Sequence, residues 1–247
     1  MKIFNLKSFE TLPDAVLLDT DNTLYLYETA HNFALNAVKE KFIITFAVSS
    51  KEFNSTFKMA RNEIHQRLKG KGSSHSRLLY MQRMLEILGL GSQVLMALDF
   101  EQTYWRSFLS KAILFDDSKE FLEILRAYRI PVAIVTDLTA QIQFRKMVYF
   151  GLENHFDYIV TSEEADFDKP NEAPFKLAID KMGAANKNIW MIGDSIENDV
   201  AGAKESISAV TLHKVNSPRS IYNDVVPDAS FHKFKDLINL LKKIKNK

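Results

Sequence analysis

The chain has 247 residues, a formal net charge of +1 and a hydrophobic content of 46%. This composition is typical of a globular protein with one large or two small domains, and it excludes an extensively disordered chain. Because the sequence contains no cysteine, disulfides and thiolate metal sites are also excluded. The small net charge provides no field that would recruit nucleic acid, so we expect no nucleic-acid partner.

The location of the protein follows from what the sequence lacks. Residues 1–12 have no apolar core of the kind found in a signal peptide, and no stretch is long enough to cross a bilayer. We therefore expect a cytoplasmic protein without a membrane partner; nothing in the sequence specifies an oligomeric state. The lysine-rich segment 235–247 fits a helix C-terminus, where lysines favour the helix dipole and solubility, better than a nucleic-acid or membrane patch.

The first predicted strand, residues 15–18, is followed at once by two acids, Asp19 and Asp21. Side chains i and i+2 of an extended chain lie on the same side, which would place both carboxylates in one small volume. Two anions this close require a metal ion, a shared proton or both. One carboxylate can attack phosphorus, and a second with a raised pKa can carry the leaving-group proton. The alternative is a loop with two solvated acids.

Residues 26–111 show helical apolar spacing almost throughout. The stretch 42–48 is the one part that could also form a strand. We expect three or four helices inserted between the first strand and the remaining sheet. This insertion predicts a helical domain at 26–111 and a core domain at 1–25 and 112–247.

The rest of the chain alternates short apolar runs with amphipathic segments of helical length. The predicted strands are 132–135, 158–160, 189–192 and 209–212, and the predicted helices are 118–128, 139–150, 173–182 and 198–204. Such alternation indicates βα units and a parallel sheet covered on both faces. The predicted fold class is α/β, with a doubly wound, Rossmann-like parallel sheet as the core and a small all-helical domain beside it.

Functional residues in open parallel sheets gather at the carboxyl ends of strands, and polar residues follow three more predicted strands. Thr136 can donate a hydrogen bond to a phosphoryl oxygen, or it can be a helix N-cap. Asp137 carries a charge that is unfavourable near phosphate, so we expect it to point away or to cap the helix. Lys169 is held extended by the proline that follows it, although most lysines are solvated. Asp194 and Asp199 follow the strand at 189–192 and are candidate metal ligands, or else helix caps.

The segments at these four strand ends resemble, in family order, the four motifs of the haloacid dehalogenase (HAD) superfamily of phosphohydrolases. Motif I is Asp19-Thr20-Asp21-Asn22-Thr23, motif II begins at Thr136, motif III is Lys169-Pro170, and motif IV is Gly193-Asp194 with Asp199. The resemblance covers about residues 14–212 and implies a Mg²⁺-dependent phosphatase acting on a small-molecule phosphate ester. It also implies that the helical insertion is a cap that selects the substrate. The run from Asp21 to Tyr25 resembles some pyrimidine nucleotidases, which leaves a nucleotide or a sugar phosphate as the candidate substrate.

The resemblance also assigns roles to the motif residues. Asp19 is the nucleophile, and Asp21 protonates the leaving oxygen and then accepts a proton from the hydrolytic water. Thr136 and Lys169 stabilise the charge of the phosphoryl group. The implied Mg²⁺ ligands are Asp19, the backbone carbonyl of Asp21 and Asp194, with Asp199 binding through water or orienting Lys169. Dehalogenases of the superfamily lack the second acid, so Asp21 argues against halide chemistry.

Substrate choice is expected to lie with the helical domain. The polar, basic segment 69–77 contains His75, Ser76 and Arg77, which are candidates for binding a second anionic or hydroxyl-rich group, beside Thr136, Asp137 and Lys169 in the core. The alternative is a flexible solvated loop in which His75 is only a helix cap.

Two other functions are compatible with the motifs. A phosphomutase or phosphotransferase would use the same residues. A non-catalytic binding protein on the same fold would usually have lost a catalytic carboxylate, and none is missing from the four motifs. A phosphatase is therefore the leading hypothesis.

Overall fold

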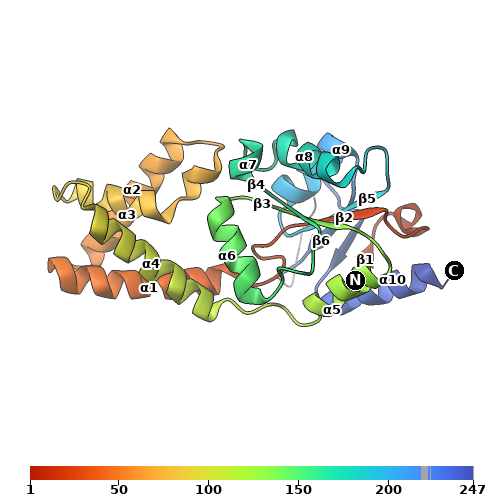
Figure 1. Cartoon of the computed structure of the whole chain (residues 1–247), viewed down its shortest axis with the longest axis horizontal. Helices are drawn as coiled ribbons and strands as arrows, with labels where there is room; N and C mark the ends of the chain where they lie inside the picture. Colours follow the sequence, from red (N-terminus) through yellow and green to blue (C-terminus); the bar gives the residue numbers. More distant parts are fainter. Residues whose placement is uncertain (218–221, 223, 247) are drawn as a thin grey trace. The chain divides into compact units, whose positions relative to one another are not determined.

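The computed structural model describes residues 1–217, 222 and 224–246 and divides into two compact units (Figure 1). The core unit consists of Met1–Leu26 and Ile113–Lys247, and the helical unit is Tyr27–Ala112. The helical unit is thus inserted into the core unit directly after its first parallel strand.

The described strands of the core unit form one seven-stranded sheet in the order β1-β7-β6-β5-β2-β3-β4. The strands are β1 (Lys2–Ile3), β2 (Ala15–Leu18), β3 (Val132–Thr136), β4 (Tyr158–Thr161), β5 (Ile189–Gly193), β6 (Val210–Lys214) and β7 (Ala229–Phe231). All neighbours are parallel except β1, which pairs antiparallel with β7. In the centre, Leu18 of β2 pairs with Ile134 and Ile192, so β2, β3 and β5 end at the same edge. The predicted α/β fold class is confirmed.

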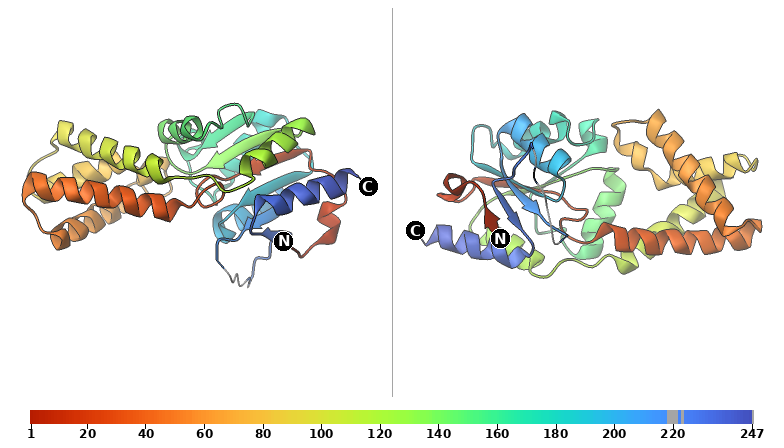
Figure 2. Two further views of the ribbon diagram at one scale, coloured as in Figure 1. Left: turned by 90° about the horizontal axis from the view of Figure 1, so that it is seen from below. Right: turned by 180° about the vertical axis from the view of Figure 1, so that it is seen from behind.

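Helices cover both faces of this sheet. They are η1 (Leu6–Phe9), α5 (Ser118–Ala127), α6 (Ala140–Phe150), α7 (Ser162–Ala165), α8 (Glu172–Met182), α9 (Gly202–Ile207) and α10 (Phe234–Lys245), with a π-helical turn η3 (Ile196–Ala201). Helices α8 and α9 lie on one face, and α5 and α10 lie on the other (Figure 2). Ala15 and Leu17 share a buried core with Phe175 of α8 and Ala203 of α9. Since both faces are buried, the strands are continuous apolar runs rather than alternating ones.

The helical unit is built from α1 (Tyr27–Phe46), α2 (Ser50–Arg67), α3 (Arg77–Ile87) and α4 (Val94–Lys111), with a short 3₁₀ turn, η2 (Gly72–His75). Its core is aromatic: the Phe42 ring lies 5.4 Å from Phe53 and 4.9 Å from Phe100. The stretch 42–48, which could have formed a strand, is the last turn of α1 and the loop after it. Val38 and Phe42, spaced one helical turn apart, are both buried, so helical packing decides the conformation there.

The structure differs from the sequence prediction in a few elements. The predicted helix at 198–204 begins as the π-helical turn η3 and continues as α9. The predicted strand at 209–212 starts at Val210 and extends to Lys214. Strands β1 and β7 have two and three residues, which is too short to show a periodic pattern. Within the described residues, no helix is both long and apolar enough to cross a membrane.

Candidate active site

Asp19 follows β2 directly and is only 6% exposed. Its Oδ1 accepts a hydrogen bond from Lys169 Nζ at 2.8 Å, and its Oδ2 accepts one from Thr23 Oγ1 at 2.8 Å. The chain turns back through Asn22, whose φ of 60° is left-handed and is tolerated by asparagine better than by most residues. This turn brings the Thr23 hydroxyl onto Asp19, so both carboxylate oxygens have fixed partners.

Lys169 is 5% exposed and joins three elements of the core. Besides Asp19, its Nζ donates to Asp199 Oδ1 at 2.6 Å and to the carbonyl of Val135 at 3.0 Å. A buried ammonium is stable only when it is paired, and two carboxylates provide the pairing. Lys169 is therefore not the solvated surface residue that most lysines are.

Asp137 fixes the loop that carries Lys169. Its Oδ1 accepts hydrogen bonds from the backbone N–H of Lys169 at 3.0 Å and from Ser162 Oγ at 2.9 Å. Burial raises the pKa of Asp137, and the charge of Lys169 opposes that shift. The N-cap residue of α6 is Thr139, so neither Asp137 nor Thr136 caps this helix.

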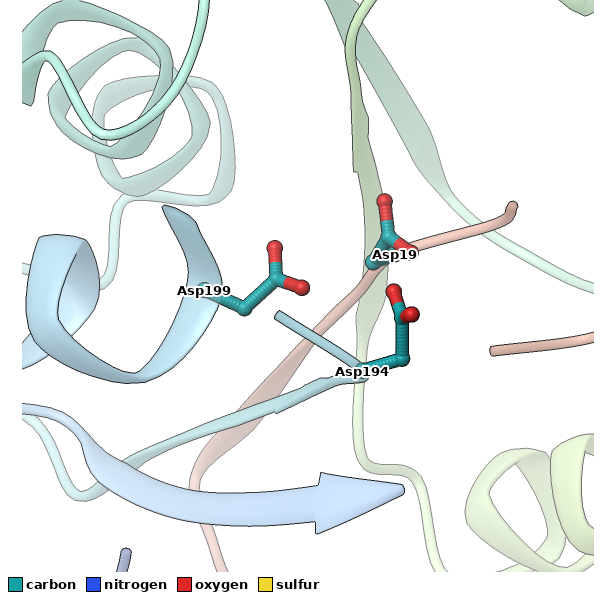
Figure 3. Close-up of side chains that lie close together, drawn as sticks. All are labelled: Asp19, Asp194 and Asp199. Atoms are coloured by element: carbon teal, nitrogen blue, oxygen red, sulfur yellow. The ribbon is translucent and has the colours of Figure 1, made fainter. Parts of the chain in front are cut away.

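Three carboxylates converge at the ends of β2 and β5 (Figure 3). Asp19, Asp194 and Asp199 each offer a ligand atom, and these atoms lie within 4.8 Å of one another. A Cβ built on Gly193 would collide with the carboxylate of Asp199, so only glycine permits this approach. Asp199 Oδ2 also accepts a hydrogen bond from the backbone of Ser195 at 3.0 Å, which fixes the carboxylate that pairs with Lys169.

The charges of this cluster are unbalanced. Burial, together with the nearby charge of Asp199, raises the pKa of Asp194 to about 7. Burial also raises the pKa of Asp19, and the adjacent Lys169 lowers it only in part. One ammonium cannot neutralise three carboxylates, so the cluster favours a proton or a cation. Hard carboxylate oxygens are the ligands that Mg²⁺ prefers, and the donor set therefore fits this ion.

Thr136, the last residue of β3, lies at the same edge of the sheet. Its Oγ1 is 2.8 Å from Thr20 Oγ1 and accepts a hydrogen bond from Gln143 Nε2 at 2.8 Å. Because Gln143 is a donor to this oxygen, the hydroxyl proton of Thr136 can be directed towards another acceptor. A phosphoryl oxygen is a suitable acceptor.

Asp21 has a set of partners separate from those of Asp19. Lys146 Nζ, from α6, donates to Asp21 Oδ1 at 2.8 Å and to Oδ2 at 3.1 Å, and the hydroxyl of Tyr25 also donates to Oδ1. Lys146 is completely buried. Lys146 was not among the residues predicted from the sequence. The available signal was that Gln143 and Lys146, spaced i and i+3, put polar groups on one face of a predicted helix.

His213 and Lys214 of β6 lie beside the site and were also missed, because the predicted strand ended at residue 212. His213 Nε2 donates to the carbonyl of Asp194 at 2.8 Å. Burial lowers the pKa of Lys214 to about 8, and its Nζ donates to Asn216 Oδ1 at 2.7 Å. Asn216 in turn donates to the carbonyl of Asn22 at 2.7 Å, which ties β6 to the turn after β2.

The candidates in the helical unit lie around the start of α3. Ser76 is the N-cap residue, and its Oγ accepts a hydrogen bond from the backbone of Leu79 at 3.3 Å. The capping role considered for His75 therefore belongs to Ser76. Ser74 and Arg77 are buried, so the segment is not a fully solvated loop.

Comparison with known proteins decides the family. Residues 13–206 match the model of the haloacid dehalogenase-like hydrolases. The chain belongs to this hydrolase family. A relative from Halopiger xanaduensis, named ribulose-1,5-bisphosphate 5-phosphatase, is 33% identical over 87% of this chain and 89% of its own length. Another relative, from Methanocaldococcus jannaschii and named glyceraldehyde 3-phosphate phosphatase, is 23% identical over 93% of this chain and 97% of its own length. With these phosphatase relatives, the chain is a HAD-like phosphohydrolase.

Solved structures agree on the fold. A HAD phosphatase from Thermococcus onnurineus has a TM-score of 0.71 and 23% identity, covering 92% of this chain and 97% of that one. A 2-haloacid dehalogenase from Pseudomonas syringae has a TM-score of 0.77 and 20% identity, covering 94% of this chain and 99% of that one. At these identities the likeness shows the HAD fold alone, and the reaction must be argued from the site.

Proposed function

We propose that the protein is a Mg²⁺-dependent phosphatase that hydrolyses a sugar phosphate through an aspartyl-phosphate on Asp19. One observation carries the proposal: two carboxylates at the end of one strand have separate partners. Asp19 is held by Lys169 and Thr23, whereas Asp21 is held by Lys146 and Tyr25. One acid can therefore act as nucleophile while the other carries a proton.

The reaction follows from these positions. A carboxylate oxygen of Asp19 attacks phosphorus, the bond to the leaving oxygen breaks, and Asp21 gives that oxygen a proton. Asp21 then accepts a proton from water, which attacks phosphorus, releases phosphate and regenerates Asp19. Lys169 balances the charge on Asp19, and Thr136 donates to a phosphoryl oxygen.

The metal ligands in this proposal are Asp19 and Asp194, with the backbone carbonyl of Asp21 by family resemblance. Asp199 is within reach of the same volume and also orients Lys169. When bound, the cation shields the charge between the attacking carboxylate and the phosphoryl group.

The substrate class follows from the relatives. The names ribulose-1,5-bisphosphate 5-phosphatase and glyceraldehyde 3-phosphate phosphatase favour a small sugar phosphate over a nucleotide. We propose that the helical unit, Tyr27–Ala112, is the cap that selects this substrate.

A phosphate-release panel with Mg²⁺ tests the proposal. It should contain ribulose 1,5-bisphosphate, glyceraldehyde 3-phosphate, several nucleoside monophosphates and para-nitrophenyl phosphate. We expect turnover of at least one sugar phosphate, faster than of any nucleotide, and loss of turnover in EDTA. Failure to release phosphate from any compound would refute the phosphatase assignment, and faster transfer to a sugar acceptor than to water would replace it with a phosphotransferase.

The raised pKa of Asp194 makes the stability of the metal-free protein depend on pH. The folded protein holds a proton on Asp194 up to about pH 7, whereas an unfolded chain releases it near pH 4. Stability from this group is therefore present below about pH 4 and is lost as the pH rises to about 7. In EDTA at about pH 8, Asp194→Asn should raise Tm by a few degrees, and Mg²⁺ should raise the Tm of the unsubstituted protein but not of the variant. Thermal unfolding at several pH values measures both effects. A lower Tm for Asp194→Asn than for the unsubstituted protein at about pH 8 would contradict the raised pKa of Asp194.

A further inference from the structure

The peptide unit that follows Asp194 is held at both ends by side chains. Its carbonyl, that of Asp194, accepts a hydrogen bond from His213 Nε2 at 2.8 Å. Its N–H, that of Ser195, donates to Asp199 Oδ2 at 3.0 Å. Because a peptide unit is planar and rigid, two such contacts fix its orientation and with it the Cα of Asp194. The carboxylate of Asp194, which points towards that of Asp19 in Figure 3, is thus carried by a fixed backbone.

His213 reaches this carbonyl because of the register between two strands. It lies on β6, and its Cα is paired with that of Gly193, the last residue of β5 and the neighbour of Asp194. His213 is only 6% exposed, so water has little access to the contact. Removal of the imidazole would therefore take a donor from the Asp194 carbonyl that water cannot readily replace.

Tyr222 determines which ring nitrogen of His213 carries the proton. The carbonyl of Asp194 can only accept, so Nε2 is protonated. In the neutral ring Nδ1 is then an acceptor, and the hydroxyl of Tyr222 donates to it at 2.7 Å. Burial lowers the pKa of His213, which favours this neutral form. Tyr222, His213 and the Asp194 carbonyl thus form one directed chain of hydrogen bonds.

The same chain could serve stability alone, because most buried carbonyls are paired whatever their function. Two features favour a role in cation binding. The chain ends on the backbone of a candidate ligand, Asp194, and the other end of the same peptide is fixed by Asp199, a second member of the acidic cluster. Groups that orient a metal ligand in this way commonly determine the metal affinity of the site.

We propose that His213, oriented by Tyr222, is a positioning residue that holds Asp194 for cation binding. The inference rests on the proposed function, in which Asp194 is a ligand of Mg²⁺. Without the imidazole, the peptide would keep only its contact through the N–H of Ser195. The carboxylate of Asp194 would then have to be ordered when the cation binds, and this ordering lowers the affinity.

Binding of Mn²⁺ to the full-length protein tests the inference without turnover. Mn²⁺ binds to the same oxygen ligands as Mg²⁺, and the electron paramagnetic resonance signal of the free ion weakens when it binds. At about pH 8, His213→Leu should raise the Kd for Mn²⁺ about tenfold or more, as is typical for loss of a group that orients a metal ligand. Because the imidazole is neutral, the substitution changes no charge.

Further variants test whether the hydrogen bonds themselves matter. His213→Gln, whose amide can again donate to the carbonyl, should have a Kd close to that of the unsubstituted protein. Tyr222→Phe removes only the hydroxyl and should raise the Kd less than His213→Leu does. His232→Leu is the matched control, because His232 is exposed and follows β7, which is two strands away from β5. It should leave the Kd unchanged.

Asp194→Asn separates this inference from the proposed function, and it should raise the Kd at least as far as His213→Leu. If Asp194→Asn raises the Kd and a folded His213→Leu does not, the positioning role is wrong and the metal site stands. If neither variant changes the Kd, Asp194 is not a cation ligand and both proposals are wrong. If His213→Leu fails to fold, an unchanged Kd in Tyr222→Phe would overturn the positioning role.

Discussion

Replacement of Asp19 by asparagine is expected to reduce phosphate release at least about 1,000-fold, because an amide cannot act as the nucleophile. The shape of the side chain is kept. Its carbonyl oxygen can still accept from Lys169, and its amino group can donate to the Thr23 hydroxyl, which now accepts. The protein should therefore remain folded, as judged by circular dichroism and thermal unfolding.

Asp14→Asn is the matched control for this substitution. Asp14 lies just before β2, at its other end, and its Oδ2 accepts from the backbone of Asn188 at 2.8 Å. We expect this variant to retain activity. Turnover by Asp19→Asn within tenfold of the unsubstituted protein would refute the assignment of Asp19 as nucleophile.

The strand ends were predictable from the sequence because two patterns coincide there. Leu18 completes a buried apolar run and Asp19 ends it, and a parallel sheet brings such ends to one edge whatever the distance along the chain. Lys169 and Asp199, thirty residues apart, thus share an ion pair of 2.6 Å. The same reasoning placed Thr136 and Asp194 at this edge.

The supporting residues were not predictable in the same way. Lys146 is a long, charged side chain, and such residues are usually exposed, so the sequence favours a surface position for it. Its burial depends on pairing with Asp21, which only the fold brings close. The π-helical turn η3 was missed for a related reason. Its position reflects the approach of Asp199 to Gly193, which is a tertiary constraint rather than a local preference.

Lys146→Met is expected to lower kcat for alkyl phosphates about 100-fold, with a smaller change in KM. Lys146 is completely buried, and its ammonium is held 2.8 and 3.1 Å from the two oxygens of Asp21. Methionine fills a similar volume but removes the two hydrogen bonds that fix this carboxylate. Tyr25 and Thr20 would still donate to Oδ1 of Asp21, but without the two hydrogen bonds from Lys146 the acid would spend less time where proton transfer requires it.

The kinetic consequence separates positioning of Asp21 from a general loss of stability. para-Nitrophenolate needs no proton to leave, so formation of the aspartyl-phosphate from para-nitrophenyl phosphate should depend little on Asp21. Its hydrolysis still requires a base, and dephosphorylation should become rate-limiting in Lys146→Met. We therefore expect a pre-steady-state burst of about one equivalent of para-nitrophenolate, which Asp19→Asn cannot show.

Lys176→Met is the matched control, since Lys176 is exposed and pairs with Glu172 one turn away on α8; it should leave kcat unchanged. Lys146→Arg, which restores a cation and two donors, should recover part of kcat, as a positioning role requires. A different result would show that Lys146 serves stability alone. In that case Lys146→Met would lower Tm, its turnover of alkyl phosphates and of para-nitrophenyl phosphate would fall equally, and no burst would be seen. The burst is therefore the decisive measurement, because it depends on how Asp21 is held in the second half of the reaction and not on how much protein is folded.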